Sequence, residues 1–111
     1  MLIEKRNAPD IGDVITIKLI SGEEIIGRLL EKIGDMIVIG KPLQIIMQPI
    51  SATQMGLGFR PVLGSVSEDA TLQFPLTALT VRPMKSNDDV TRSYIQATTG
   101  LVTANASILT A

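Results

Sequence analysis

The carboxylates Glu23-Glu24 and Asp88-Asp89 are the side chains of this chain whose type best suits catalysis, and they occur as two adjacent pairs. Paired carboxylates can act as general acid and base or hold a divalent metal ion. Neighbours on a strand point to opposite faces, however, and two acids at a helix start are typical of dipole compensation. The chain has no histidine and no cysteine, which excludes His-based catalysis, Cys nucleophiles and ordinary zinc sites. We therefore expect a protein that is not an enzyme and needs no cofactor or metal.

Lys41 and Arg60 are the cations of the sequence that best suit binding of an anionic partner. They are the only charged residues between Met36 and Ser67, so this stretch carries +2, whereas the first forty residues carry five bases and seven acids, a balance of −2. Segregated cations attract phosphate groups even though the whole chain carries −1. The alternative is that both are simply solvated at strand ends. Phe59, beside Arg60, either stacks on a nucleic-acid base or packs in the core.

Composition bounds the class of protein. The chain has 111 residues, 45% of them hydrophobic and 19% charged, which fits a single domain spanning the whole chain, with its core over about 12–84. No apolar run approaches the ~20 residues needed to cross a bilayer, and the amino terminus lacks the apolar stretch of a secretory signal. The absence of cysteine is compatible with a reducing compartment. We expect a soluble cytoplasmic protein with no membrane partner.

The elements that position these residues are predicted to be β-strands. Residues 14–20 alternate apolar and polar side chains, and residues 23–33 form a second strand after a turn at Ser21-Gly22. Glycine takes positive φ cheaply, which suits Gly22, and Gly27 inside the second strand predicts a bend or a bulge. The apolar run at 36–39 does not alternate, which predicts a strand covered on both faces.

Further strands and one helix follow. The β pattern resumes at 43–50, which can form one long bent strand with 36–39, and a further strand is predicted at 55–63. The last strand pattern, at 71–74 and 79–81, has a break near Pro75. Residues 65–69 form an acidic loop suited to a flexible insertion. A short helix is predicted over 88–98, with Asn87 as its cap, Val90, Tyr94 and Ile95 on one face and Gly100 at its end, before a loose tail over 101–111. We predict a mainly β fold: a small, strongly bent, five-stranded antiparallel sheet forming an open barrel, with a C-terminal helix.

The first predicted hairpin carries a family resemblance. Its hydrophobic strand, glycine turn and glycine-kinked second strand are built from Val14, Ile17, Leu19, Gly22, Gly27 and Leu29. This pattern resembles the first signature motif of the Sm/LSm family, and other SH3-like or OB-like barrels share its spacing. The whole chain, including KPLQIIMQPI and YIQATTGL, resembles Sm-like proteins of marine cyanophages and ocean metagenomes. The resemblance implies an SH3-type open barrel and, for a phage protein, the cytoplasm of a bacterial host.

The resemblance also implies candidate binding residues. The family's base-binding loop combines an Asp, a stacking residue and an Asn at the third strand; here Asp35 and Ile37 are the candidates, and no Asn follows. The family's apolar-Arg-Gly turn has two approximate counterparts, at Arg60 and at Arg82, and in both a proline replaces the glycine. Nucleic-acid binding is therefore expected to involve Lys41 and Phe59 beside these residues, and a uridine pocket of the usual kind is not expected.

Oligomerisation follows from the apolar strands. Two-sided apolar strands and open sheet edges need covering, which predicts self-association. Sm-like domains pair the fourth strand of one subunit with the fifth of the next, so the resemblance implies a homo-oligomeric ring in which 54–63 pairs with 79–83 of a neighbour. The two hypotheses for function are a non-enzymatic ring that binds RNA or single-stranded DNA, with a role in nucleic-acid processing, and a structural or adaptor ring of a phage that binds proteins.

Overall fold

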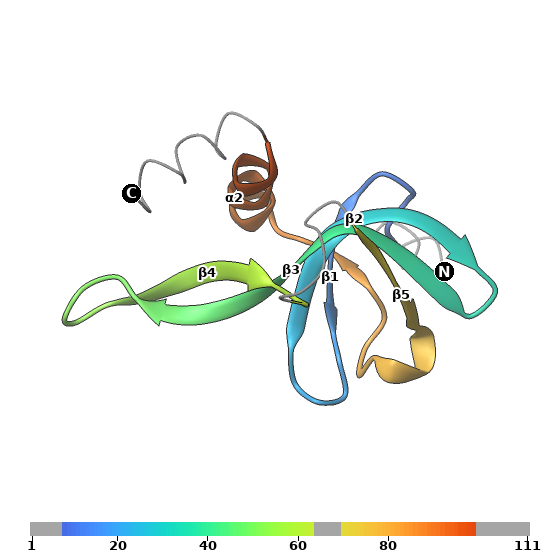
Figure 1. Cartoon of the computed structure of the whole chain (residues 1–111), viewed down its shortest axis with the longest axis horizontal. Coiled ribbons are helices and arrows are strands. Elements are labelled where there is room, and N and C mark those ends of the chain that lie inside the picture. The colour runs from blue at the N-terminus through green and yellow to red at the C-terminus, as the bar shows by residue number, and fades with distance from the viewer. Residues whose placement is uncertain (1–7, 64–69, 100–111) are drawn as a thin grey trace.

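The computed structural model, which describes residues 8–63 and 70–99, is mainly β (Figure 1). In chain order its elements are β1 (Val14–Lys18), β2 (Glu24–Ile33), β3 (Met36–Pro49), β4 (Met55–Pro61), β5 (Thr71–Pro75), the 3-10 turn η1 (Leu76–Ala78), β6 (Met84–Lys85) and the helix α2 (Asp88–Thr98). The predicted mainly β fold with a short C-terminal helix is confirmed. The loop predicted at 65–69, Gly100 and the predicted tail at 101–111 lie outside the described residues.

The strands form one antiparallel sheet in the order β4-β3-β2-β1-β6, and β5 pairs with β3 off this path. β3 therefore has partners along its whole length: residues 36–40 pair with β5 and residues 43–49 pair with β4. In the described part of the chain the two ends of the sheet do not pair with each other, so the sheet is bent and open, as predicted. It has six strands rather than five because β6 adds two residues to the edge of β1.

The segment after Pro75 differs from the prediction. Instead of a strand over 79–81, the chain forms η1, then a single isolated bridge between Leu79 and Leu19, and regular pairing with β1 resumes only at β6. The physical reason lies in Pro83, which has no amide hydrogen and cannot continue a ladder. The predicted break near Pro75 coincides with the start of η1.

The larger core cluster fills one face of the bent sheet. It consists of six side chains from β1, β2 and β3, none more than 3% exposed: Ile15, Ile17, Ile25, Leu29, Ile37 and Ile39. Alternation along β1 places Ile15 and Ile17 on this face. Val38 lies between two of these residues in β3 and is itself only 7% exposed. Burial on both faces, predicted for this strand from its unbroken apolar run, is confirmed.

Two glycines stand where the hairpin of β1 and β2 turns and bends. Gly22 has φ +107°, in the left-handed region that favours glycine. Gly27 lies at a shift in register between β2 and β3. A Cβ atom on Gly27 would overlap the Ile39 side chain and lie 2.9 Å from the carbonyl oxygen of Gly40. The absence of a side chain thus lets β3 cross β2 closely.

α2 covers the other face of the sheet and has the predicted bounds. The Asn87 side chain accepts a hydrogen bond from the amide of Val90 at 2.9 Å, which caps the helix as predicted. Tyr94, 1% exposed, packs with Val14 and Ile26 in a second core cluster, whereas Ile95 is 39% exposed. Burial raises the pKa of Tyr94 to about 12. Within residues 8–63 and 70–99, no helix has the length and apolar character that a membrane span needs.

Beyond α2, β3 and β4 continue as a two-stranded ribbon that extends away from the rest of the sheet (Figure 1). In such a ribbon, every second cross-strand pair of residues places its side chains on the same face. At the base of this face, the pair Ile45 and Phe59 packs against the cluster around Tyr94. Further out, the face holds an apolar strip of Met47, Pro49, Met55 and Leu57. The Met47, Met55 and Leu57 side chains are 60%, 56% and 51% exposed. The strip is therefore an exposed apolar surface that is continuous with the core.

Candidate functional site

A groove of about 730 Å³ lies between the turn that joins β2 to β3 and the segment from η1 to β6. The turn side contributes Gly34, Met36 and Ile37, and the facing segment contributes Leu76 and residues 79–84. Most of these side chains are aliphatic or methionine, so the groove has an apolar lining. Apolar concave sites with a few polar groups are the usual form of binding sites.

Backbone contacts hold the two sides of the groove together. Gly34 has φ +58°, which lets β2 turn directly into β3. The amide of Leu76 donates to the carbonyl oxygen of Asp35 at 2.7 Å, so η1 is fixed to the tip of this turn. On the far side, the amide of Thr80 donates to the carbonyl oxygen of Lys18 at 2.9 Å. The groove is therefore bounded by backbone that is hydrogen-bonded at both ends.

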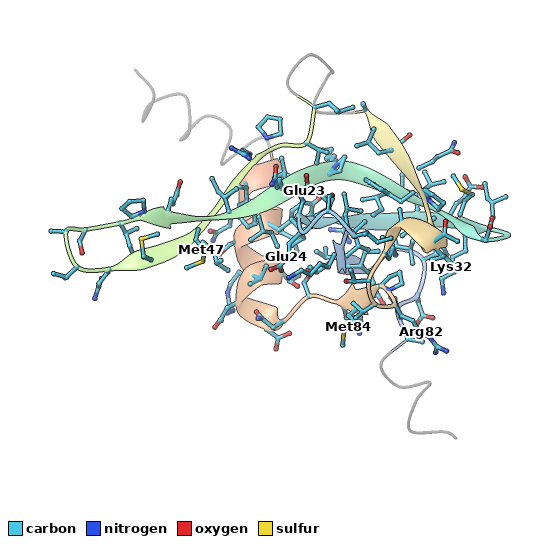
Figure 2. All side chains as sticks on the ribbon, turned by 90° about the horizontal axis from the view of Figure 1, so that it is seen from below. Glu23, Glu24, Lys32, Met47, Arg82 and Met84 are labelled. Carbon is cyan, nitrogen blue, oxygen red and sulfur yellow. The ribbon has the colours of Figure 1, made fainter. Side chains whose placement is uncertain are left out.

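Two cations border the groove, Lys32 from β2 and Arg82 from the segment before β6, and Figure 2 shows both at the same end of the molecule. The Lys32 Nζ donates to the carbonyl oxygen of Pro9 at 2.9 Å. Arg82 makes no hydrogen bond or ion pair within residues 8–63 and 70–99. Since the described lining of the groove includes no carboxylate, its charged groups are both positive. Such a site attracts anions.

The predicted residues of the base-binding loop lie at one end of this groove, in different environments. Asp35 is exposed at the tip of the turn, where its backbone binds η1. Ile37 is 3% exposed and belongs to the larger core cluster, although it also lines the groove floor. The neighbouring Met36 is half-buried and lines the groove. Met36 rather than Ile37 is thus the side chain of this loop that is open to a ligand.

The two arginines that resemble the family's turn are far apart in the fold. Arg82 borders the same groove as the residues that follow Asp35. Arg60 lies on β4, outside the groove lining, and its Nε donates to the Gln44 side chain at 3.2 Å. Of the two, only Arg82 shares a site with the predicted loop. Phe59 packs edge-on against Tyr94, with ring centroids 6.5 Å apart and an interplanar angle of 82°, so the structure places this ring in the core beneath α2.

Lys41 was expected to bind nucleic acid, but its side chain points away from the groove. Its Nζ is 3.4 Å from the carbonyl oxygen of Thr98, so the side chain reaches the C-terminal end of α2. The helix has no basic residue in its last turn, and a cation placed there favours the helix dipole. Lys41 and Arg60 do not line the groove. The paired cations of the site are Lys32 and Arg82.

Sequence reasoning missed Lys32, Met36 and Met84 as groove residues. Lys32 directly follows the exposed Glu31 in a strand of mixed polarity, which is the ordinary pattern of a solvated face. What distinguishes it is the approach of residues some fifty positions later in the chain, from Leu79 to Met84. No local signal in the sequence reports such a contact.

The two carboxylate pairs lie in separate places, at the β1–β2 turn and at the start of α2. The Ser21 hydroxyl donates to Glu23 and holds its pKa below the ordinary value, while Glu24, next to it, is exposed (Figure 2). Asp89 forms an ion pair with Arg92 at 2.6 Å on the surface of α2. Within residues 8–63 and 70–99, no three carboxylates gather where they could hold a metal ion. Comparison of the chain with protein-family models and with curated proteins finds no match.

Proposed function

We propose that this protein is a non-enzymatic, Sm-like ring subunit that binds single-stranded RNA or DNA in the groove between the β2–β3 turn and η1. The observation that carries the proposal is the pair Lys32 and Arg82 at the border of an apolar groove without a carboxylate in its described lining. Phosphates are attracted by the two cations, and the apolar lining, Met36 among it, accepts the faces of bases. Although the whole chain carries a net charge of −1, Lys32 and Arg82 make the groove locally positive, where the nucleic-acid strand would lie.

A ring would repeat this groove around a symmetry axis and multiply its weak contacts. β4 is at the end of the sheet order and has β3 as its one strand partner in the described residues. Val81, 56% exposed, lies in the segment that is expected to receive the β4 edge of a neighbour. Pairing of 54–63 with 79–83 of the next copy would cover both elements and place Arg82 beside the subunit boundary.

Binding is tested by fluorescence anisotropy with labelled single-stranded RNA and DNA at about 50 mM and about 200 mM salt. We expect salt-sensitive binding by the wild type. Lys32→Ala and Arg82→Ala should each weaken it about tenfold, since each removes a charge-assisted phosphate contact. Each should also reduce the salt dependence by about one phosphate contact.

Lys18→Ala is the matched control, because it removes an exposed cation that lies outside both the groove lining and the expected subunit interface. It should change the affinity less than about twofold. Equal losses in Lys18→Ala and Lys32→Ala would show that general charge, and not the groove, carries binding. If the wild type fails to bind at low salt, the proposal is wrong and the protein-binding alternative stands.

The ring is tested separately by the mass in solution. We expect light scattering to give a multiple of the 11.9 kDa subunit mass. Val81→Asp places a charge in the expected interface and should shift the mass toward that of the monomer. Ile11→Asp changes a side chain of similar exposure, 57%, outside the expected interface, and should leave the assembly intact. A wild-type protein that stays monomeric contradicts the ring.

The alternative function, a structural or adaptor ring that binds proteins, is favoured by one observation. The apolar strip on the ribbon of β3 and β4 exposes three large side chains, each more than half accessible. Contiguous exposed apolar side chains are typical of protein-binding surfaces. This function predicts that charge substitutions in the strip, such as Leu57→Lys, disturb assembly or partner binding, and that the groove variants Lys32→Ala and Arg82→Ala do not.

A further inference from the structure

A second, smaller pocket of about 470 Å³ lies between the C-terminal end of α2 and the middle of β3. Arg28, Lys41, Thr71, Tyr94 and Thr98 are among its lining residues. The pocket shares no described residue with the groove that contains Lys32 and Arg82. It is thus a separate feature of the opposite side of β3.

Lys41 is held in an unusual backbone conformation at this pocket. Its φ is +47°, and it is the one non-glycine residue of the described chain in the left-handed region. That region is unfavourable for a lysine and more so before a proline, here Pro42. The Tyr94 hydroxyl fixes the conformation, because its oxygen lies 2.8 Å from the Lys41 carbonyl oxygen and 3.2 Å from that of Gly40. Strain that the surroundings hold in place is characteristic of functional positions.

Arg28 is brought to the same pocket by the register of the sheet. It pairs with Gly40, directly before Lys41, just after the register shift at Gly27. Its Nη1 donates to the carbonyl oxygen of Gly12 at 2.6 Å, and the Lys41 Nζ faces the carbonyl oxygen of Thr98. Both cations therefore bind neutral carbonyl groups.

No carboxylate neutralises this pair within residues 8–63 and 70–99. The ion pairs there join Lys85 to Asp13 and Arg92 to Asp89. The end of α2 contributes only about half a negative charge, against two full positive charges. Among the described residues the local balance is about +1.5, similar in size and opposite in sign to the charge of a phosphate monoester. Thr71 adds a hydroxyl to the lining that has no hydrogen-bond partner among the described residues.

We propose that this pocket binds a phosphate group, with Arg28 and Lys41 as its charged ligands and the Thr71 hydroxyl as a further donor. Arg28 presents a planar donor fork suited to phosphate oxygens, and Lys41 acts as a point charge. The phosphate comes either from a small free anion or from a nucleic-acid backbone that extends beyond the groove.

The test is an amide NMR titration of the full chain with inorganic phosphate at constant ionic strength. We expect saturable shifts confined to Gly40 and Lys41 of β3, the end of α2 and Thr71. Arg28→Gln and Lys41→Gln should each weaken binding about tenfold, and Lys41→Arg should retain it. Lys18→Gln changes an exposed cation outside both the pocket and the expected subunit interface, and should bind as the wild type does.

A second titration distinguishes a nucleic-acid phosphate from a small free anion. It uses the double variant Lys32→Ala/Arg82→Ala, whose groove has lost both cations. A single-stranded oligonucleotide that produces the same shifts identifies a backbone phosphate, whereas shifts with inorganic phosphate alone identify a small anion. Shifts spread over the whole surface, or unchanged in Arg28→Gln and Lys41→Gln, would overturn the proposal. Because the two pockets share no residue, this result is independent of nucleic-acid binding in the groove.

Discussion

Replacement of Tyr94 by alanine is expected to lower the free energy of unfolding by about 3–5 kcal/mol, the usual cost of truncating a buried aromatic residue. Tyr94 is the largest fully buried side chain of the described residues and joins α2 to β1, β2 and the base of the ribbon. Truncation would leave a cavity and release the hydroxyl contacts to Gly40 and Lys41. The measurement is urea denaturation followed by far-ultraviolet circular dichroism.

Ile95→Ala, one position along the same helix and 39% exposed in the wild type, is the matched control and should cost less than about 1 kcal/mol.

The variant Tyr94→Phe removes the hydroxyl and keeps the aromatic ring, so it measures the contribution of the hydroxyl alone. The folded-state pKa of Tyr94 is raised to about 12, above its unfolded value of about 10. Its neutral form therefore stabilises the fold fully below about pH 10, and this contribution is lost as the pH rises toward 12. Wild type should lose stability relative to Tyr94→Phe across that window; equal pH profiles, or equal costs for both alanine variants, would contradict burial of Tyr94.

Replacement of Gly27 by alanine is expected to cost about 1–3 kcal/mol, because the added Cβ meets another backbone and not only a side chain. The carbonyl oxygen of Gly40 lies 2.9 Å from that position, and the Ile39 side chain lies closer. Neither can move without shifting β3 against β2, since both belong to the paired strand. The same denaturation experiment measures the loss.

Gly58→Ala is the comparison for Gly27→Ala, since it also adds a methyl group to a buried strand glycine. At Gly58 the new atom would meet the end of the Gln48 side chain, which can rotate away. We expect this variant to lose less than about 1 kcal/mol. If both variants are equally stable, the close approach of β2 and β3 at Gly27 is not a requirement of the fold.

Elements with strong local signals were predictable from the sequence. The start of the helix over 88–98 is predictable because Asn87 is a favoured cap residue and two acids follow it. The unbroken apolar run at 36–39 predicts the buried strand. By contrast, the segment over 79–83 has an alternating pattern, yet Pro83 interrupts the ladder that this pattern would need.

The groove could not be predicted because its parts are far apart in the chain. Arg82 was a candidate beside Arg60, and nothing in the local sequence distinguishes the two. The distinction comes from the contact of η1 with Asp35, a pairing of residues about forty positions apart. Lys41 shows the same limit: its isolated charge suggested a rim position, but a left-handed φ and the Tyr94 hydroxyl direct it to the end of α2.

The way β3 shares its partners has a consequence for the covalent chain. β4 leaves β3 at the pair Leu43 and Pro61, and β5 rejoins the same strand at the pair Gly40 and Thr71. The two behave as one interrupted strand, and the described residues Val62 and Leu63 between them take part in no strand ladder. A break of the peptide chain between Val62 and Leu63 would divide the protein into two fragments and leave every strand pairing described above in place. β5, β6 and α2 would remain attached to the first fragment through the strand pairings, the ion pair of Lys85 with Asp13 and the packing of Phe74, Leu79 and Tyr94 in the two core clusters. This is the arrangement that fragment complementation requires.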